Sequence, residues 1–171
     1  MRKTIHLQNI ILEGCDKTGK TSIAKKLIEL CPTLKYLHFT APKNYGDGQK
    51  QYIKLIKKLN NEHGLVCDRS WLGEGVYAPL MRGYTPDYLR NLEKSILNHN
   101  YLFLIIADEN KVLKRFDGKF IIPAQINYVL SEFKKEFDNC NVQKKFVIDT
   151  TNDNISTCVN NILNYVRDDT S

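Results

Sequence analysis

One glycine-rich segment near the N-terminus constrains the fold of this chain more than any other feature of its sequence. Residues 14–22 read Gly-Cys-Asp-Lys-Thr-Gly-Lys-Thr-Ser and match the pattern G-x-x-x-x-G-K-[ST]. The apolar run Ile5–Leu12 before the segment is typical of a strand, and apolar residues recur at helical spacing over Lys20–Leu30. A strand, a tight turn and a helix in this order let backbone N–H groups surround a phosphate. The segment therefore predicts a binding site for a nucleoside triphosphate.

The rest of the chain alternates short apolar runs with longer amphipathic segments. Apolar residues run almost without a break over Tyr101–Ala107, as expected of a strand that is covered on both faces. The alternation predicts an α/β fold with helices on both faces of a parallel sheet. Since no linker or repeat is visible, we expect a single domain over residues 1–171. Further strands are expected over Lys35–Phe39, Gly64–Cys67 and Lys145–Asp149, and further helices over Gln49–Leu59, Trp71–Arg82, Pro86–Asn98, Pro123–Phe137 and Ile155–Arg167.

Composition excludes several classes of protein. Hydrophobic residues make up 42% of the chain and charged residues 26%, which rules out a disordered or collagen-like protein. The apolar runs are far shorter than the roughly 20 residues of a membrane helix, and the segment after Arg2 and Lys3 is too polar for a secretory signal. The five cysteines form no C-x-x-C pair. These features predict a cytoplasmic protein with reduced thiols and no membrane contact.

The net charge of +6 predicts partners that are acidic. Nucleic acid and small phosphorylated molecules would both meet that requirement. The sequence contains no basic segment with interleaved aromatic residues, which nucleic-acid-binding proteins often carry. We therefore expect small-molecule nucleotides, and not nucleic acid, as partners.

Residues of the glycine-rich loop have distinct expected roles. Lys20 would reach the terminal phosphates of the triphosphate, and the hydroxyl of Thr21 would bind Mg²⁺. Cys15 lies at a predicted helix N-terminus with Lys17 and Lys20 nearby, which predicts a lowered thiol pKa, although packing is its favoured role. The residues expected to bind the phosphates are Gly14, Asp16, Lys17, Thr18, Gly19, Lys20, Thr21 and Ser22.

Three motifs, in order, resemble those of the thymidylate kinase family. Residues 12–21 are similar to the family's phosphate loop, E-G-x-[DE]-x-x-G-K-[ST]. Residues 68–70, Asp-Arg-Ser, resemble the motif D-R-[YHS], and residues 108–115 resemble the segment D-p-x-x-a-l-x-R that leads into a lid. Residues 147–150 also resemble the family's closing strand, so that the likeness extends over most of residues 10–166.

The resemblance implies a three-layer α/β/α P-loop kinase with a five-stranded parallel sheet in the order 2-3-1-4-5 and a short lid near residues 115–122. It implies ATP as phosphoryl donor, Mg²⁺ as cofactor and a deoxynucleoside monophosphate as acceptor, with dTMP as the default and dGMP as a second option. Since family members tend to form homodimers, a homodimer is also expected. The alternatives are a deoxynucleoside kinase that phosphorylates a 5′-hydroxyl, a non-catalytic nucleotide-binding protein, and a kinase of a non-nucleotide acceptor such as a sugar acid.

The resemblance assigns roles to five charged residues. Asp68 would hold Mg²⁺, or would act as base on a 5′-hydroxyl in a nucleoside kinase; a plainer alternative is that it caps the following helix. Arg69 would bind the acceptor phosphate as a bidentate fork, or would form a surface ion pair. Asp16 would contact the acceptor's 3′-hydroxyl or its surroundings. Lys17 or Arg115 would bring the positive charge that phosphoryl transfer requires.

Three aromatic residues are candidate contacts of the acceptor. Tyr45 lies in a turn-rich segment where the family places acceptor contacts, and Phe39 would stack on a base. Tyr77 stands nine residues after Asp68, by resemblance beneath the sugar, where it would exclude a 2′-hydroxyl. For Phe39 and Tyr77 the alternative is ordinary packing in the core.

Glu74 departs from the family pattern, because several members carry a small polar or amide residue at this position. An ionised carboxylate accepts hydrogen bonds only, which suits the adjacent N–H groups of guanine better than the single N3–H of thymine. The alternative for Glu74 is a salt bridge to Arg82, eight residues on, or to Arg90. Arg82 is itself a candidate acceptor contact by resemblance.

Overall fold

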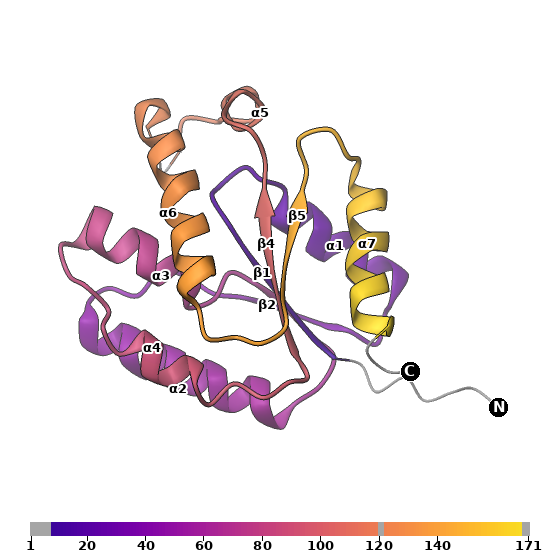
Figure 1. Ribbon diagram of the computed structural model, residues 1–171, viewed down its shortest axis with the longest axis horizontal. Coiled ribbons are helices and arrows are strands. Elements are labelled where there is room, and N and C mark those ends of the chain that lie inside the picture. The colour runs from indigo at the N-terminus through magenta and orange to yellow at the C-terminus, as the bar shows by residue number, and fades with distance from the viewer. Residues whose placement is uncertain (1–7, 120–121, 169–171) are drawn as a thin grey trace.

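A parallel β-sheet lies at the centre of the fold, with a layer of helices on each face (Figure 1). The computed structural model describes residues 8–119 and 122–168, so that residues 5–7 of the first predicted strand lie outside the described part. Neighbouring strands pair in parallel in the order β2-β3-β1-β4-β5, which confirms the predicted fold class and strand order. The strands are β1 (Asn9–Glu13), β2 (Lys35–His38), β3 (Leu65–Asp68), β4 (Asn100–Ile106) and β5 (Lys145–Asp149).

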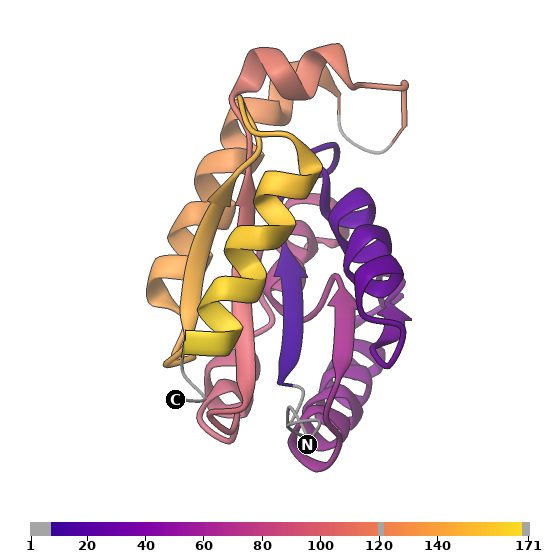
Figure 2. The same ribbon diagram turned by 90° about the vertical axis from the view of Figure 1, so that its right-hand side faces the viewer.

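The helices divide between the two faces of the sheet. α5 (Glu109–Lys114) follows β4 at the carboxyl ends of the strands, and Figure 2 shows it at the same end of the sheet as the loop between β1 and α1. Among the described residues, no helix is both long and apolar enough to cross a membrane. Figure 1 shows α1 (Lys20–Leu30) and α7 (Ile155–Asp168) on one side of the sheet, and on the other α2 (Tyr45–Asn61), α3 (Leu72–Tyr77), α4 (Leu89–Glu93) and α6 (Ile126–Asn139).

Apolar side chains alternate along β1 into two cores, one on each face of the sheet. Ile11 belongs to the core that includes residues of α2, α3 and α6, whereas Ile10 and Leu12 belong to the core that includes residues of α1 and α7. Every residue of β1 is buried as a result. Because both faces are covered, the loops at the carboxyl ends of the strands are where this type of sheet binds ligands.

α4 is much shorter than predicted, because a side chain from α2 competes for its backbone. It covers only Leu89–Glu93, whereas the sequence pattern predicts a helix over Pro86–Asn98. Asn60 donates to the carbonyl of Ser95 (2.7 Å) and accepts from the N–H of Leu97 (3.0 Å). These bonds turn the chain toward β4 and end the helix.

Two further helix boundaries differ from the prediction for local reasons. α3 ends early and continues as a π-helical turn over Ala78–Arg82, where Pro79 lacks the N–H that an α-helix needs. α2 begins earlier than predicted, at Tyr45, because the side chain of Asn44 accepts from the N–H of Asp47 (2.9 Å) and caps the helix.

Asn9 is a buried polar residue that joins the start of β1 to its neighbours. Its Nδ2 lies 2.8 Å from the carbonyl oxygens of Leu59 and Glu62 and from Oδ1 of Asn100. Its Oδ1 accepts from the N–H of Leu65 (2.9 Å). Because Asn9→Ala would leave these groups without a partner, we expect it to lower the free energy of unfolding by about 3 kcal/mol, measured by urea denaturation.

Asn61→Ala is the matched control, since Asn61 is exposed at the end of α2. We expect this variant to remain within about 0.5 kcal/mol of the parent protein. If Asn9→Ala were as stable as Asn61→Ala, Asn9 would not have the structural role assigned to it.

Candidate active site

The loop between β1 and α1 lies at the carboxyl ends of the strands, next to β4. Gly14 (φ 143°) and Gly19 (φ 104°) have left-handed backbone conformations. A Cβ atom on Gly14 would collide with the carbonyl oxygen of Ile105 in β4. The two glycines therefore allow a tight turn between strand and helix, the arrangement in which backbone N–H groups bind phosphate. The predicted phosphate-binding residues, Gly14 and residues 16–22, lie together in this one turn and the start of α1.

Lys20 lies within this loop and is only 5% exposed. Its Nζ donates to the carbonyl oxygens of Gly14 (2.8 Å) and Cys15 (2.6 Å). Burial lowers the pKa of Lys20, and the positive charge of Arg69 acts in the same direction. A phosphate in the loop would favour the charged form of the lysine. The adjoining cavity is lined by Lys17, Lys20, Thr21, His38, Arg69 and Arg115, among others.

Asp68, at the end of β3, faces the loop. Its Oδ2 accepts from the hydroxyls of Thr21 (2.7 Å) and Tyr36 (2.9 Å), and Nδ1 of His38 lies 3.7 Å from it. Its Oδ1 is buried and has no hydrogen-bond partner among the described residues. A buried carboxylate oxygen without a partner, next to the hydroxyl of Thr21, fits a hard cation such as Mg²⁺. The two predicted metal ligands therefore lie side by side.

Tyr36 and His38 are contacts of Asp68 that the sequence did not predict. Their spacing along β2 could have indicated them, because residues two apart in a strand share a face of the sheet. In the register of the two strands, His38 lies opposite Asp68. Both side chains are therefore on the face of the sheet where Thr21 lies, in the first turn of α1.

The alternative role of Asp68, as the cap of α3, is wrong. The carboxylate of Glu13 does this instead: its Oε1 accepts from the N–H groups of Ser70 (2.7 Å) and Gly73 (3.1 Å) and from the hydroxyl of Ser70 (2.7 Å). Glu13 is buried and lines a cavity of the site, and no role for it was predicted from the sequence. Its place in the Glu-Gly pair that begins the family-like loop was the available signal.

Arg69 lies between the phosphate loop and a second cavity, which Glu13 and Tyr77 also line. Its backbone is left-handed (φ 77°), and its N–H donates to the carbonyl of Leu12 in β1 (3.0 Å). Its guanidinium forms an ion pair with Asp16, so the partner belongs to the phosphate loop and not to a remote surface. Arg69 lines the phosphate-loop cavity and two further cavities.

The two candidate catalytic cations, Lys17 and Arg115, lie at the rim of the loop, where the side chain of one contacts the backbone of the other. The guanidinium of Arg115 donates to the carbonyl of Lys17 (3.1 Å) and to the hydroxyl of Thr150 (3.2 Å). The ammonium of Lys17 pairs with Asp117 (2.6 Å), which lies in the predicted lid segment. Residues 120–121 of that lid lie outside the described residues.

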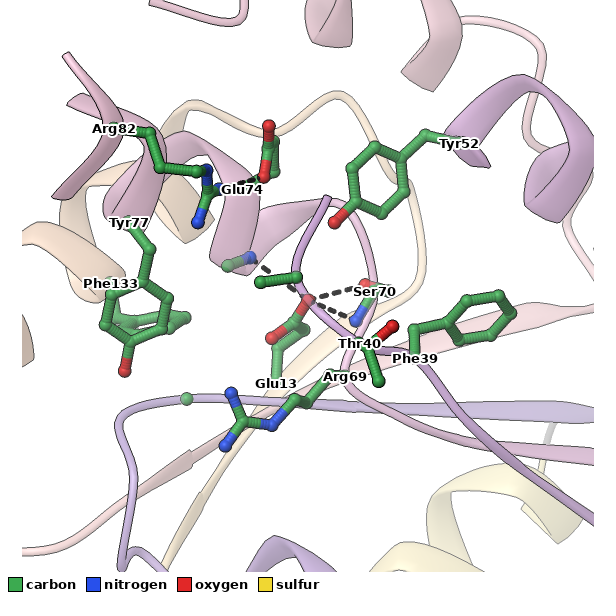
Figure 3. A pocket seen from close by; sticks show the side chains of 13 residues that line it. Glu13, Phe39, Thr40, Tyr52, Arg69, Ser70, Glu74, Tyr77, Arg82 and Phe133 are labelled. Atoms are coloured by element: carbon green, nitrogen blue, oxygen red, sulfur yellow. Dashed lines mark hydrogen bonds and ion pairs between the residues drawn. The ribbon is translucent and has the colours of Figure 1, made fainter. Parts of the chain in front are cut away.

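The second cavity has polar groups at both ends and aromatic rings between them (Figure 3). The ring of Tyr77 packs edge-on against Phe133, with 5.5 Å between the ring centroids. The hydroxyl of Tyr77 is buried and has no hydrogen-bond partner in the described part of the chain. Five of the predicted acceptor contacts line this cavity: Phe39, Arg69, Glu74, Tyr77 and Arg82.

Glu74 forms the salt bridge with Arg82 that was one of its two predicted roles. Its Oε2 pairs with the guanidinium of Arg82, and its Oε1 accepts from the hydroxyls of Tyr84 (2.5 Å) and Tyr88 (3.4 Å). Both oxygens of this fully buried carboxylate are therefore occupied. Arg90 pairs with other carboxylates. At this end of the cavity, the guanidinium of Arg82 can donate to a ligand.

Tyr45 is not brought to this cavity. Its hydroxyl donates to the carboxylate of Asp87 (2.5 Å), and its ring packs edge-on against Tyr84 and Tyr88 at centroid distances of 5.9 Å and 5.0 Å. The reason is that the turn expected here is already the start of α2, which directs the ring toward the residues before α4.

The prediction of a lowered thiol pKa for Cys15 is wrong. The side chain is 1% exposed and belongs to the apolar core. Burial raises the pKa of the thiol to about 11, and the charge of Lys20 offsets this only in part. Packing is therefore the role that the structure supports for Cys15.

Three features together define the fold of a P-loop kinase. They are the strand order, the glycine-rich loop after β1 and the aspartate at the end of the adjacent strand β3. No family model matches the chain. In sequence, the chain is 23% identical over 150 residues to a probable thymidylate kinase of Methanocaldococcus jannaschii, covering 88% of this chain and 72% of that protein. It is 31% identical over 93 residues to a putative thymidylate kinase of Acidianus bottle-shaped virus, covering 52% of this chain and 60% of the viral protein.

Solved structures of nucleotide kinases and related proteins share this fold. The YorR protein of Bacillus subtilis, solved in complex with phosphorylated GDP, aligns with a TM-score of 0.79 at 23% identity and covers 93% of this chain and 95% of its own. A deoxyadenosine kinase from M. mycoides, solved with dCMP and dCDP bound, aligns with a TM-score of 0.68 at 14% identity over 94% of this chain and 99% of its own. The comparisons support a thymidylate kinase-like P-loop kinase of the nucleotide kinase class.

Glu74→Gln tests the salt bridge with Arg82. The amide keeps the size of the side chain but removes the negative charge, which leaves a largely buried guanidinium without its counter-charge. We expect the free energy of unfolding to fall by about 2 kcal/mol in urea denaturation. The matched control is Glu29→Gln, because Glu29 forms an exposed pair with Lys26 and such pairs contribute about 0–1 kcal/mol. Equal effects of the two substitutions would contradict a structural role for Glu74.

Proposed function

We propose that this protein transfers the terminal phosphate of ATP, with Mg²⁺, to a deoxynucleoside monophosphate. The position of Arg69 is the observation that carries the proposal, since its side chain lines both the phosphate-loop cavity and the second cavity. A guanidinium between donor and acceptor sites suits an acceptor that brings a phosphate of its own. Phosphoryl transfer needs such alignment and positive charge more than it needs covalent chemistry.

Donor binding is proposed at the glycine-rich loop. Lys20 would exchange its bonds to the loop carbonyls for bonds to the transferring phosphate. Thr21 and Asp68 would hold Mg²⁺, which when bound neutralises charge on the phosphates. Lys17 and Arg115 would add positive charge around the group in transfer; the guanidinium of Arg115 is held at the rim by the backbone carbonyl of Lys17.

Two acceptor nucleotides are proposed. The default is dTMP, because the relatives reported above are named thymidylate kinases. The second is dGMP, since the YorR protein is described with phosphorylated GDP. Glu74 offers no free oxygen to either base in this arrangement. The donors of Arg82 would instead meet base acceptors, O4 of thymine or O6 and N7 of guanine.

Phosphorylation of a 5′-hydroxyl is the second candidate function. The fold shared with the M. mycoides deoxyadenosine kinase favours it. In that reaction Asp68 would be the base, as the sequence motif allows. An assay that offers ATP with each deoxynucleoside and its monophosphate separates the two functions. Preference for the unphosphorylated nucleosides would replace the first proposal with the second.

Lys20→Ala tests the donor site. It removes the ammonium that would stabilise the transferring phosphate, so we expect turnover to fall by at least about a hundredfold while the fold persists. Steady-state kinetics and circular dichroism measure the two effects. Lys26→Ala is the control, because Lys26 lies on the same helix but forms only an exposed pair. Turnover of Lys20→Ala at the rate of this control would overturn the phosphate-loop assignment.

Arg69→Ala tests the acceptor phosphate. Loss of a charge-assisted bidentate contact should lower kcat/KM for monophosphate acceptors by about tenfold to a hundredfold. Slow phosphorylation of a nucleoside, which has no phosphate for Arg69 to hold, should change less. Equal losses for dTMP and deoxythymidine would show that Arg69 does not bind the acceptor phosphate.

A further inference from the structure

Two histidines meet at the edge of the sheet opposite the phosphate loop. His63 lies two residues before β3, and His99 directly precedes β4. Because the strands are parallel, both residues lie at the amino ends of the strands, away from the loop between β1 and α1 (Figure 2). The ring centroids are 4.4 Å apart, with 38° between the ring planes. β3 and β4 are separated by β1, so it is the fold that brings these two side chains together.

The backbone that carries the two rings is held by one buried residue, Asn9. Its N–H donates to the carbonyl of His99 (2.9 Å). Its Nδ2 donates to the carbonyl oxygens of Leu59 and Glu62 (2.8 Å each), the second of which directly precedes His63. Both histidine-bearing segments are therefore fixed to the start of β1. The rings are positioned before any ligand arrives, which reduces the entropy cost of binding.

Hydrogen bonding leaves nitrogen lone pairs available on both rings. Nε2 of His99 lies 2.8 Å from the carbonyl oxygen of Leu59. Because a carbonyl only accepts, this nitrogen carries the ring proton, and Nδ1 of the neutral ring keeps its lone pair. His63 is exposed, and its ring nitrogens have no hydrogen-bond partner among the described residues. An imidazole that donates its other N–H to a backbone carbonyl is the usual form of a histidine that binds a metal ion.

The distance between the rings suits two ligands of one metal ion. Metal–nitrogen bonds of about 2.0–2.1 Å, at an angle between 90° and tetrahedral, place two imidazole centroids about 4.5–5 Å apart. The observed 4.4 Å is close to the short end of that range. Imidazole nitrogen suits Zn²⁺, Cu²⁺ and Ni²⁺, whereas Mg²⁺ and Ca²⁺ prefer oxygen ligands. In the part of the chain that the structure describes, no third histidine, cysteine or carboxylate completes the group, so water would fill the other positions.

We propose that His63 and His99 together bind a divalent transition-metal ion of the class of Zn²⁺, at a site separate from the Mg²⁺ site proposed at Asp68. The ion would join the segment between α2 and β3 to the segment before β4, and binding would stabilise this edge of the sheet. With two protein ligands, the site is weaker than a structural zinc site, which has four. This inference goes beyond the proposed function, and no nucleotide takes part in it.

An NMR titration of the full chain with ZnCl₂ tests the inference. We expect the ring resonances of His63 and His99 to shift together and to saturate with one Kd. MgCl₂ at the same concentrations should leave both rings unshifted, because Mg²⁺ prefers oxygen ligands. If neither ring responded to millimolar Zn²⁺, the two histidines would only stack on each other, and the inference would be overturned.

His63→Asn removes one ligand, and the fold should persist because His63 makes no side-chain hydrogen bond among the described residues. The Kd for Zn²⁺, reported by the ring of His99, should rise by about a hundredfold or more, since two groups that bind together exceed either alone by about that factor. His38→Asn is the matched control: it removes an imidazole at the opposite edge of the sheet and should keep the parent Kd. An unchanged Kd in His63→Asn would show that His99 binds the ion alone, contrary to the inference.

Thermal unfolding gives a second, independent measurement. A ligand that binds only the folded protein raises its stability, so Zn²⁺ in hundredfold excess over its Kd should raise the unfolding midpoint of the parent protein by about 5 °C or more. His63→Asn should show no such rise at the same concentration. A rise of equal size in His63→Asn would place the stabilising ion elsewhere in the molecule and overturn the inference, whereas the proposed function would be unaffected.

Discussion

The pairing of β1 with β3 is the constraint on which the site depends. Their register sets Leu12 opposite Asp68, and the N–H of Arg69 extends the pairing to the carbonyl of Leu12. The chain therefore leaves both strands at the same edge of the sheet, with Glu13 on one strand next to Ser70 beyond the other. Without this register, the phosphate loop, the carboxylate that we propose to bind Mg²⁺ and the arginine that we propose to bind the acceptor would not share one cleft.

Charge balance explains how several buried carboxylates coexist beside a proposed phosphate site. A buried charge is costly unless it is paired or well hydrogen-bonded. Each acidic group here has such a partner within the site, whether an arginine, hydroxyls or backbone N–H groups. The carboxylates are those of Glu13, Asp16, Asp68 and Glu74, and the neighbouring cations are Lys20, Arg69 and Arg82.

Local sequence patterns predicted the elements of the sheet well, because strand and helix periodicity depends on near neighbours in the chain. α1 and β5 begin and end where the sequence indicates. The prediction was wrong for α4, where the distant side chain of Asn60 ends the helix. Tyr45 was misplaced because the cap from Asn44 extended α2 over the expected turn.

The sequence by itself determined that a phosphate-binding loop follows the first strand, since that loop needs only adjacent residues with glycine at fixed positions. It also predicted functional roles for Asp68 and Arg69, through their resemblance to a family motif. The tertiary structure alone decided that Glu74 pairs with Arg82 and that Glu13, not Asp68, caps α3. The bonds of Glu13 join residues 57 to 60 positions apart, and sequence periodicity carries no information about which donor satisfies which acceptor over such a separation.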